Sequence, residues 1–130
     1  MGISERTSSR TRIAPHRILL IDNDAEIAGA LGSALCAEGY HVRSTTHGAD
    51  LLRLVSLVEP DVLVTDVIME DVDTLEVMAT LRQSHPDMKI IAISGNAHLL
   101  TLASKCGANH VLAKPFRLQR LSLLVKIAVQ

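Results

Sequence analysis

Carboxylate, hydroxyl and ammonium side chains follow short apolar runs at several points of this sequence. In chain order these polar residues and their neighbours are Asp22, Asn23, Asp24, Asp66, Ser94 and Lys114. Carboxylates that lie together repel one another, and a divalent cation that prefers oxygen ligands, Mg²⁺ or Mn²⁺, offsets the repulsion. A lysine can neutralise a transferred phosphoryl group, and a serine can hydrogen-bond to it. These residue types therefore indicate phosphoryl transfer in which one carboxylate is the nucleophile.

The sequence lacks the motifs of several other functional classes. No GxxxxGK[ST] occurs, and no GxGxxG follows the first apolar run, so nucleotide binding is disfavoured. Aromatic residues make up only 2% of the chain, which argues against a single-stranded nucleic-acid binder. No apolar run approaches the ~20 residues of a membrane span, and the first residues lack the apolar region of a signal peptide. Cys36 and Cys106 have no metal-ligand spacing, and we expect buried, reduced thiols in a cytoplasmic protein.

The formal net charge of -1 is unevenly distributed along the chain. The first 17 residues carry four arginines and one glutamate among many Ser and Thr residues. Such a segment could touch nucleic acid or a membrane, but a solvated, disordered tail is the favoured interpretation. We therefore expect a disordered basic tail over residues 1–16 and one folded domain over residues 17–130.

Short apolar runs alternate with helical patterns along this domain. Strands are expected at residues 18–21, 41–45, 62–66, 89–93 and 110–113, and a helix is expected after each. Three helices have expected bounds, at residues 49–58, 97–105 and 116–129. Asn23 with Glu26, and Asp73 with Glu76, have the spacing of capping boxes at the starts of the other two. Gly39 is expected to end the first helix.

Strands that alternate with helices predict an α/β fold with a parallel sheet and helices on both faces. For five such units we favour the doubly wound, flavodoxin-like strand order 2-1-3-4-5. Ligands bind these sheets at the carboxyl ends of the strands. The first, third, fourth and fifth strands are adjacent in this order, so the polar residues named above should converge.

Four segments of the sequence resemble the response-regulator receiver family of two-component signalling. They are ILLIDND (18–24), PDVLVTDVIM (60–69), IIAIS (90–94) and GANHVLAKPF (107–116). They occur in the family's order and spacing, and the resemblance extends over residues 17–129.

The resemblance implies a role for each residue of the predicted site. Asp66 would be the phosphoacceptor, which attacks a phosphohistidine on a sensor histidine kinase or phosphotransfer protein. Asp22 and the backbone carbonyl of Ile68 would bind Mg²⁺ or Mn²⁺ together with Asp66. Ser94 would sense the phosphoryl group, and Lys114 would pair with that group or with Asp66.

The resemblance also implies how such a domain works and what it contacts. It is a phosphoacceptor that assists its own phosphorylation and is not an enzyme. It binds a downstream protein or a second copy through the face formed by the fourth helix, the fifth strand and the fifth helix. The peptide bond between Lys114 and Pro115 is expected to be cis, as is usual in the family.

Four residues depart from the family pattern. Asn23 replaces a second acidic residue and is either a weaker metal ligand or an N-cap, so metal affinity should fall. Glu70 either restores a carboxylate near the metal or is a solvated loop charge. Thr74 replaces a loop glycine. Val111 replaces the aromatic switch residue of the fifth strand, so the coupling of Ser94 to an aromatic rotamer is missing or replaced.

The last two expected helices are apolar around more than one face. The residues concerned are Leu99, Leu100 and Leu102, then Leu118, Leu121, Leu123, Leu124, Val125 and Ile127. A helix packed on a sheet needs only one apolar stripe, so part of each helix should be exposed. Exposed apolar patches indicate a partner surface, whereas the alternative is a broad contact with the core.

Two other functions remain open at this stage. One is a receiver-like interaction module that works without phosphorylation, which Asn23, Thr74 and Val111 favour. The other is a phosphatase of the haloacid-dehalogenase type, with Asp22 as nucleophile and Asp24 as acid. Against the phosphatase, Ala25-Glu26 stands where that family has Gly-Thr, and the chain is short for that fold.

Overall fold

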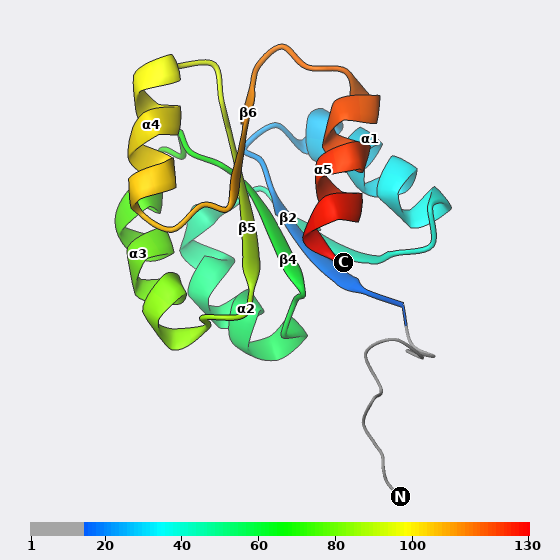
Figure 1. Cartoon of the computed structure of the whole chain (residues 1–130), viewed down its shortest axis with the longest axis horizontal. Helices are drawn as coiled ribbons and strands as arrows, with labels where there is room; N and C mark the ends of the chain where they lie inside the picture. The colour runs from blue at the N-terminus through cyan, green and yellow to red at the C-terminus, as the bar shows by residue number, and fades with distance from the viewer. Residues whose placement is uncertain (1–14) are drawn as a thin grey trace, which may run out of the picture.

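Five parallel strands form the centre of the computed structural model, which describes residues 15–130 (Figure 1). The strands are β2 (Arg17–Ile21), β3 (His41–Thr45), β4 (Val62–Asp66), β5 (Lys89–Ser94) and β6 (His110–Ala113). Their order in the sheet is β3-β2-β4-β5-β6. This order is the flavodoxin-like 2-1-3-4-5 arrangement that the sequence predicts.

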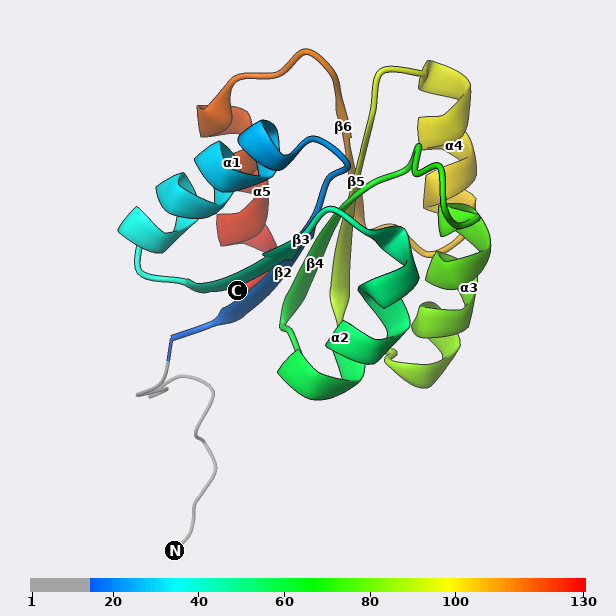
Figure 2. The same cartoon turned by 180° about the vertical axis from the view of Figure 1, so that it is seen from behind.

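Helices cover both faces of the sheet. They are α1 (Ala25–Ala37), α2 (Leu51–Val58), α3 (Thr74–Ser84), α4 (Ala97–Lys105) and α5 (Leu118–Ala128), and a short 3₁₀ helix, η2 (Gly48–Asp50), precedes α2. Figures 1 and 2 show α1 and α5 on one face and α2, α3 and α4 on the other. Within residues 15–130, no helix is both long enough and apolar enough to cross a membrane.

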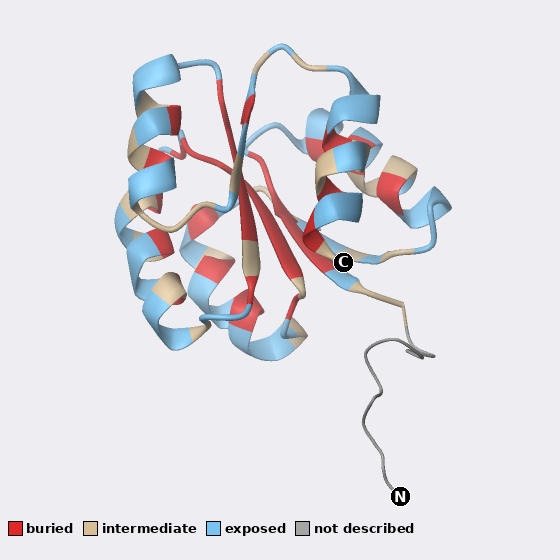
Figure 3. Ribbon diagram, viewed as in Figure 1, coloured by how far each residue is buried: buried red, intermediate tan, exposed pale blue. Residues whose placement is uncertain are grey.

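The alternation of side chains along each strand divides the core into two layers. Leu19 and Ile21 of β2 belong to the cluster that packs against α2, α3 and α4. Ile18 and Leu20 belong to the cluster that packs against α1 and α5. All four side chains are buried, which explains why β2 is an unbroken apolar run (Figure 3). The buried strands form a fixed platform for the residues at their carboxyl ends.

Asp24, not Asn23, caps the first helix. The Asp24 carboxylate accepts hydrogen bonds from the backbone N–H groups of Glu26 and Ile27, at 2.9 and 3.2 Å. The capping box predicted for Asn23 and Glu26 is therefore wrong by one residue. The cap predicted for α3 is confirmed, because the Asp73 carboxylate accepts the Glu76 N–H at 3.3 Å.

Three further expectations differ from the structure. The helix expected at residues 49–58 begins as the 3₁₀ turn η2 and becomes α-helical only at Leu51. The last helix is shorter than expected, since it spans Leu118–Ala128. The thiols are not buried: Cys36 is exposed and Cys106 is half-buried. The inward stripe of α1 is Ala28, Leu31 and Leu35, and Cys36 lies outside it.

The ends of the helices follow the usual backbone chemistry. Gly39, expected to end the first helix, has a φ of 99°, a left-handed conformation that favours glycine.

The basic tail predicted for residues 1–16 lies almost wholly outside the described residues; of it the structure describes only Pro15 and His16.

Candidate functional site

The two carboxylates of the predicted site come from neighbouring strands. Asp66 is the last residue of β4, and Asp22 directly follows β2. The parallel register pairs Ile21 with Thr65, which places the next residue of each strand side by side. Both side chains are buried, with 2% of Asp22 and 4% of Asp66 exposed. Buried carboxylates are costly unless they have partners, so the contacts of these two residues define the site.

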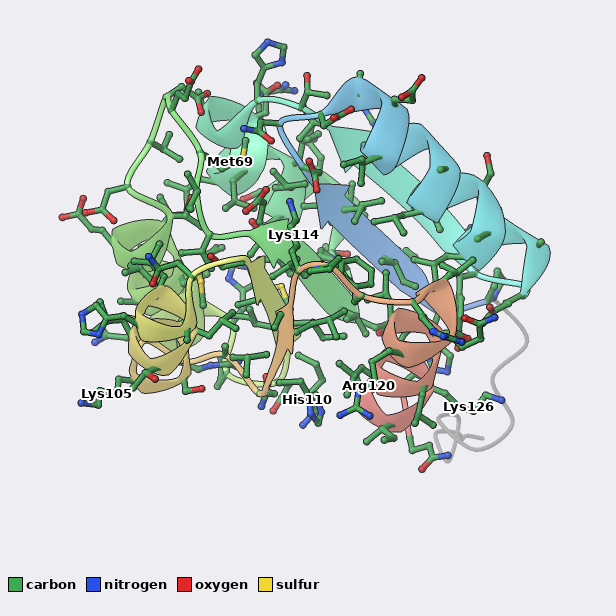
Figure 4. The ribbon with its side chains drawn as sticks, turned by 90° about the horizontal axis from the view of Figure 1, so that it is seen from above. Met69, Lys105, His110, Lys114, Arg120 and Lys126 are labelled. Atoms are coloured by element: carbon green, nitrogen blue, oxygen red, sulfur yellow. The ribbon has the colours of Figure 1, made fainter. Side chains whose placement is uncertain are left out.

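Lys114 provides the positive charge that both carboxylates face. Its Nζ lies 2.9 Å from Oδ2 of Asp66 and 3.5 Å from Oδ2 of Asp22. The backbone N–H of Lys114 donates to the carbonyl of Ser94, which fixes the start of this loop against β5. Figure 4 shows Lys114 over the carboxyl ends of the central strands. The Lys114–Pro115 peptide is cis, as expected.

The charge of Lys114 is secured by these contacts. Partial burial acts to lower the pKa of Lys114, but the hydrogen bond and charge of Asp66, together with those of Asp22, raise it above its ordinary value. The ammonium is therefore protonated at neutral pH. The two carboxylates outnumber the one ammonium, so the site carries a net negative charge. A bound cation or a hydrogen-bond donor would stabilise that charge.

Backbone hydrogen bonds orient each carboxylate. Oδ1 of Asp22 accepts the N–H of Asp24 at 2.9 Å, and Oδ1 of Asp66 accepts the N–H of Ile68 at 3.1 Å. In both residues the other oxygen, Oδ2, faces Lys114. Oδ2 of Asp66 is thus the oxygen that is held by a side chain and not by the backbone, which suits a nucleophile.

Ser94 completes the set of residues at the carboxyl ends of the strands. It is the last residue of β5 and is fully buried. Its Oγ accepts the N–H of Asn96 at 3.0 Å, which leaves the hydroxyl hydrogen available for donation. The strand register pairs Asp66 with Ile93, so Ser94 follows the partner of the central carboxylate.

The remaining residues that the sequence analysis singled out form no side-chain hydrogen bond or ion pair with Lys114 or with the two carboxylates within residues 15–130. Asn23 is exposed and does not cap α1, so the N-cap alternative is excluded. The Ile68 side chain is half exposed, but its backbone is tied to Asp66 by the hydrogen bond described above. Glu70 is exposed in the loop between β4 and α3, and Val111 is exposed on β6. Thr74 is buried, and its hydroxyl has no hydrogen-bond partner within residues 15–130.

The donor atoms at this site are of the kind that a hard cation prefers. In the part of the chain that the structure describes, no three His, Cys, Asp or Glu side chains gather at one point. Two carboxylates, Asp22 and Asp66, are available, and the amide oxygen of Asn23 and the carbonyl of Ile68 lie beside them in the sequence. Mg²⁺ accepts such oxygen ligands and commonly retains several waters. These residues therefore fit Mg²⁺ better than a metal that requires nitrogen or sulfur ligands.

The sequence did not single out two residues that support the site. Thr45 ends β3, and its backbone carbonyl accepts the N–H of Asp22 at 3.3 Å. Asp71 is exposed in the loop between β4 and α3, yet it accepts hydrogen bonds from the N–H groups of Gly48 and Ala49 at the start of η2. A glycine at the start of a helix was the available signal for a close approach of two loops.

Comparison with known sequences agrees with the geometry. Residues 18–126 match the family model of the response regulator receiver domain. The DNA-binding transcriptional regulator NtrC of Rhizobium meliloti (strain 1021) is 36% identical over 106 residues, which are 80% of this chain and 22% of the relative. The response regulator MprA of Mycobacterium leprae (strain TN) is 34% identical over 107 residues, 81% of this chain and 47% of that protein. The chain spans less than half the length of either curated relative.

Solved structures of response regulators have the same fold as this chain. The beryllofluoride-activated NtrC4 receiver domain dimer is 30% identical, with a TM-score of 0.80, over 87% of this chain and 95% of that one. A putative response regulator from Chloroflexus aurantiacus J-10-fl is also 30% identical, with a TM-score of 0.81 and coverage of 88% and 98%. The chemotaxis response regulator CheY4 of Vibrio cholerae is 20% identical with a TM-score of 0.80, which shows a shared fold.

Proposed function

This chain belongs to the response-regulator receiver family of two-component signal transduction, and on that premise we propose that Asp66 accepts a phosphoryl group from a sensor histidine kinase or phosphotransfer protein. The observation that carries the proposal is the 2.9 Å contact between Oδ2 of Asp66 and Nζ of Lys114. It gives a buried carboxylate a fixed cationic partner at the carboxyl edge of the sheet. The role proposed is that of a phosphoacceptor which assists its own phosphorylation, acting in the cytoplasm.

The transfer that we propose is a displacement at phosphorus. An Oδ2 lone pair of Asp66 forms the new P–O bond while the P–N bond to the donor histidine breaks; the imidazole leaves with the electron pair and takes a proton from solvent. The ammonium of Lys114 faces the attacking oxygen of Asp66 before the transfer. After the transfer it forms an ion pair with the phosphoryl oxygens instead. Ser94 donates its hydroxyl hydrogen to a phosphoryl oxygen.

Mg²⁺ would be held by Asp22, Asp66, the carbonyl of Ile68 and, more weakly, the amide of Asn23. The ion would supply charge neutralisation for the oxygens of the transferred group. Asp22 is suited to this role because it is buried beside Asp66 and its Oδ1 is oriented by the Asp24 N–H. Asn23 contributes an oxygen without a charge, so we propose a weaker site than two adjacent acidic residues would give.

The proposed output surface is the face formed by α4, β6 and α5. Val111, Leu118 and Leu123 are exposed there by 38%, 38% and 50%. Val111 and Leu123 border a groove that Arg117 and Arg120 also line. An apolar groove with a basic rim is typical of a protein-binding surface. We propose that a downstream protein or a second copy of the chain binds here, and that these residues contact neither nucleic acid nor membrane.

One alternative keeps a specific observation in its favour. A receiver-like module that works without phosphorylation is supported by the exposed Asn23 and by Val111 in place of an aromatic residue. The phosphatase that would use Asp22 is disfavoured, because the carboxylate of Asp24, its required acid, is occupied in capping α1.

The deciding experiment is intact-mass spectrometry after incubation with a small acyl-phosphate donor, with and without Mg²⁺. We expect a Mg²⁺-dependent gain of one phosphoryl group in the wild type and no gain in Asp66→Asn. Asp22→Asn serves as the second arm, since a phosphatase would lose its covalent intermediate only in that variant. A folded wild type that gains no phosphoryl group at high Mg²⁺ would favour the phosphorylation-independent module.

A further inference from the structure

One carboxylate joins two loops on the side of the sheet that carries the site. Asp71, between β4 and α3, accepts the N–H of Ala49 at 2.9 Å through Oδ2 and the N–H of Gly48 at 3.2 Å through Oδ1. These N–H groups open the helical turn η2, whose own N-cap residue, His47, makes no side-chain capping hydrogen bond. Asp71 therefore caps η2 from a separate loop. We call these two hydrogen bonds the Asp71 bridge.

The absence of a side chain at Gly48 allows the two loops to approach each other. Gly48 is buried, and a Cβ at this position would lie 2.5 Å from Cγ2 of Val72 and 3.0 Å from Oδ1 of Asp71. A side chain at residue 48 would therefore push the two loops apart.

The Asp71 carboxylate is charged in this contact. The N–H of Ala49, with that of Gly48, lowers the pKa of Asp71 from its ordinary value. Its hydrogen bonds are therefore charge-assisted, and its negative charge lies at the positive end of the helix.

The Asp71 bridge closes a ring of contacts around the two site carboxylates. On one side, the loop that contains Asp71 begins directly after Asp66 and includes Ile68. On the other side, the turn before η2 is tied to Thr45, whose Oγ1 accepts the His47 N–H at 3.2 Å. The Thr45 carbonyl in turn accepts the N–H of Asp22. The bridge therefore connects the loop that follows Asp66 to the turn whose neighbour Thr45 accepts the N–H of Asp22.

We propose that Asp71 is a positioning residue for the phosphoryl-transfer site, a role that rests on the proposed function. It touches neither the phosphoryl group nor the metal. It holds the loop between β4 and α3, so that the backbone of Ile68 stays beside Asp66 and Asp22. Loss of the bridge frees this loop, which weakens Mg²⁺ binding without removing a ligand.

The test uses Asp71→Ala, Asp71→Asn and Gly48→Ala in the full chain. Hydrogen exchange followed by NMR reports directly on the bridge through the amides of Gly48, Ala49 and residues 68–72. We expect faster exchange at these amides in Asp71→Ala, and an intermediate effect in Asp71→Asn, which keeps one acceptor oxygen. Gly48→Ala should reproduce the Asp71→Ala result, and the double variant should be no worse than either, because both changes break one contact.

Mg²⁺ binding supplies a readout that a purely structural role would leave unchanged. Titration of amide shifts should show a Kd for Mg²⁺ raised about tenfold in Asp71→Ala. Phosphorylation by an acyl-phosphate donor should need more Mg²⁺ but reach the wild-type rate at saturation. Asp87→Ala, which removes an exposed carboxylate from the loop between α3 and β5, is the matched control and should change neither quantity.

The outcomes separate this inference from the proposed function. If the amides of residues 68–72 exchange as slowly in Asp71→Ala as in the wild type, the positioning role is overturned, whatever the Kd for Mg²⁺. An unchanged Kd in a wild type that binds Mg²⁺ would overturn it as well. If the wild type binds no Mg²⁺ and gains no phosphoryl group, the proposed function fails, and the exchange data still decide whether Asp71 holds the loop.

Discussion

Nζ of Lys114 lies 2.9 Å from Oδ2 of Asp66, although 48 residues separate them along the chain. The same ammonium lies 3.5 Å from Oδ2 of Asp22. One lysine therefore compensates two buried carboxylates that come from different strands. The stability of the folded protein and the proposed chemistry therefore depend on the same atoms.

Replacement of Lys114 should expose the repulsion between the two carboxylates. We expect Lys114→Met to lower the free energy of unfolding by about 1–2 kcal/mol without metal, less than for a fully buried pair because the lysine is partly solvated. Mg²⁺ should restore part of the loss by binding the freed carboxylates. Urea denaturation with and without Mg²⁺ measures both effects. Lys105→Met, on the exposed side of α4, is the control and should change little.

The stability that Lys114 contributes should disappear at alkaline pH. The pKa of Lys114 is raised above its ordinary value of 10.5 in the folded protein. A raised folded-state pKa means that the contribution is fully present below pH 10.5 and is lost as the pH rises through the folded-state value. The difference in unfolding free energy between wild type and Lys114→Met should follow this course. A difference that instead grew with pH would contradict the pairing.

A second acidic residue should strengthen the metal site. Asn23 is exposed beside Asp22, so Asn23→Asp introduces a carboxylate without disturbing the core. We expect the Kd for Mg²⁺ to fall on the order of tenfold, because ligand charge strongly affects the affinity for hard cations. Calorimetry or an NMR titration measures the change. Asn23→Ala tests whether the amide is a ligand at all: an unchanged Kd in that variant would remove Asn23 from the metal site.

The buried hydroxyl of Thr74 should be dispensable for stability. Only 2% of Thr74 is exposed, and its Oγ1 has no hydrogen-bond partner among the described residues. Thr74→Val keeps the shape and removes the unpaired polar group, so we expect unchanged stability or a gain of up to about 1 kcal/mol. Thr65→Val is the contrast, because Oγ1 of Thr65 donates to the carbonyl of Asp66 at 2.9 Å. That variant should lose about 1 kcal/mol in the same urea denaturation. A clear loss of stability in Thr74→Val would show that the hydroxyl has a partner.

The sequence predicted the central strands well because β2, β4 and β5 each end where an apolar run changes to a polar residue. Asp66 and Ser94 end β4 and β5 in this way. The prediction of the residue that caps the first helix was wrong by one position, because Asn23 and Asp24 are neighbours and both are good capping residues. The hydrogen bond from the Asp24 N–H to Asp22 accompanies an extended Asp24, with a φ of -99°, so the helix begins after it.

The exposure of single side chains was harder to predict than the elements that carry them. Cys36 lies one residue beyond Leu35, the last inward side chain of α1, and a rotation of about 100° per residue takes it to the surface. The apolar excess of α5 was predicted correctly, because Leu118, Leu123 and Ile127 are exposed. Leu100 of α4 is buried, so α4 itself contributes less apolar surface than its sequence indicates.

The sequence alone was enough to predict the alternation of strands and helices, to favour one strand order, and to identify the residues at the strand ends. These properties depend on local patterns and on the general rule that ligands bind at the carboxyl edge of a parallel sheet. Which of these residues touch depends on the tertiary structure. The pairing of Lys114 with two carboxylates and the Asp71 bridge both join segments that are distant in the chain. Such contacts depend on strand register and loop conformation, which no local pattern of residues specifies.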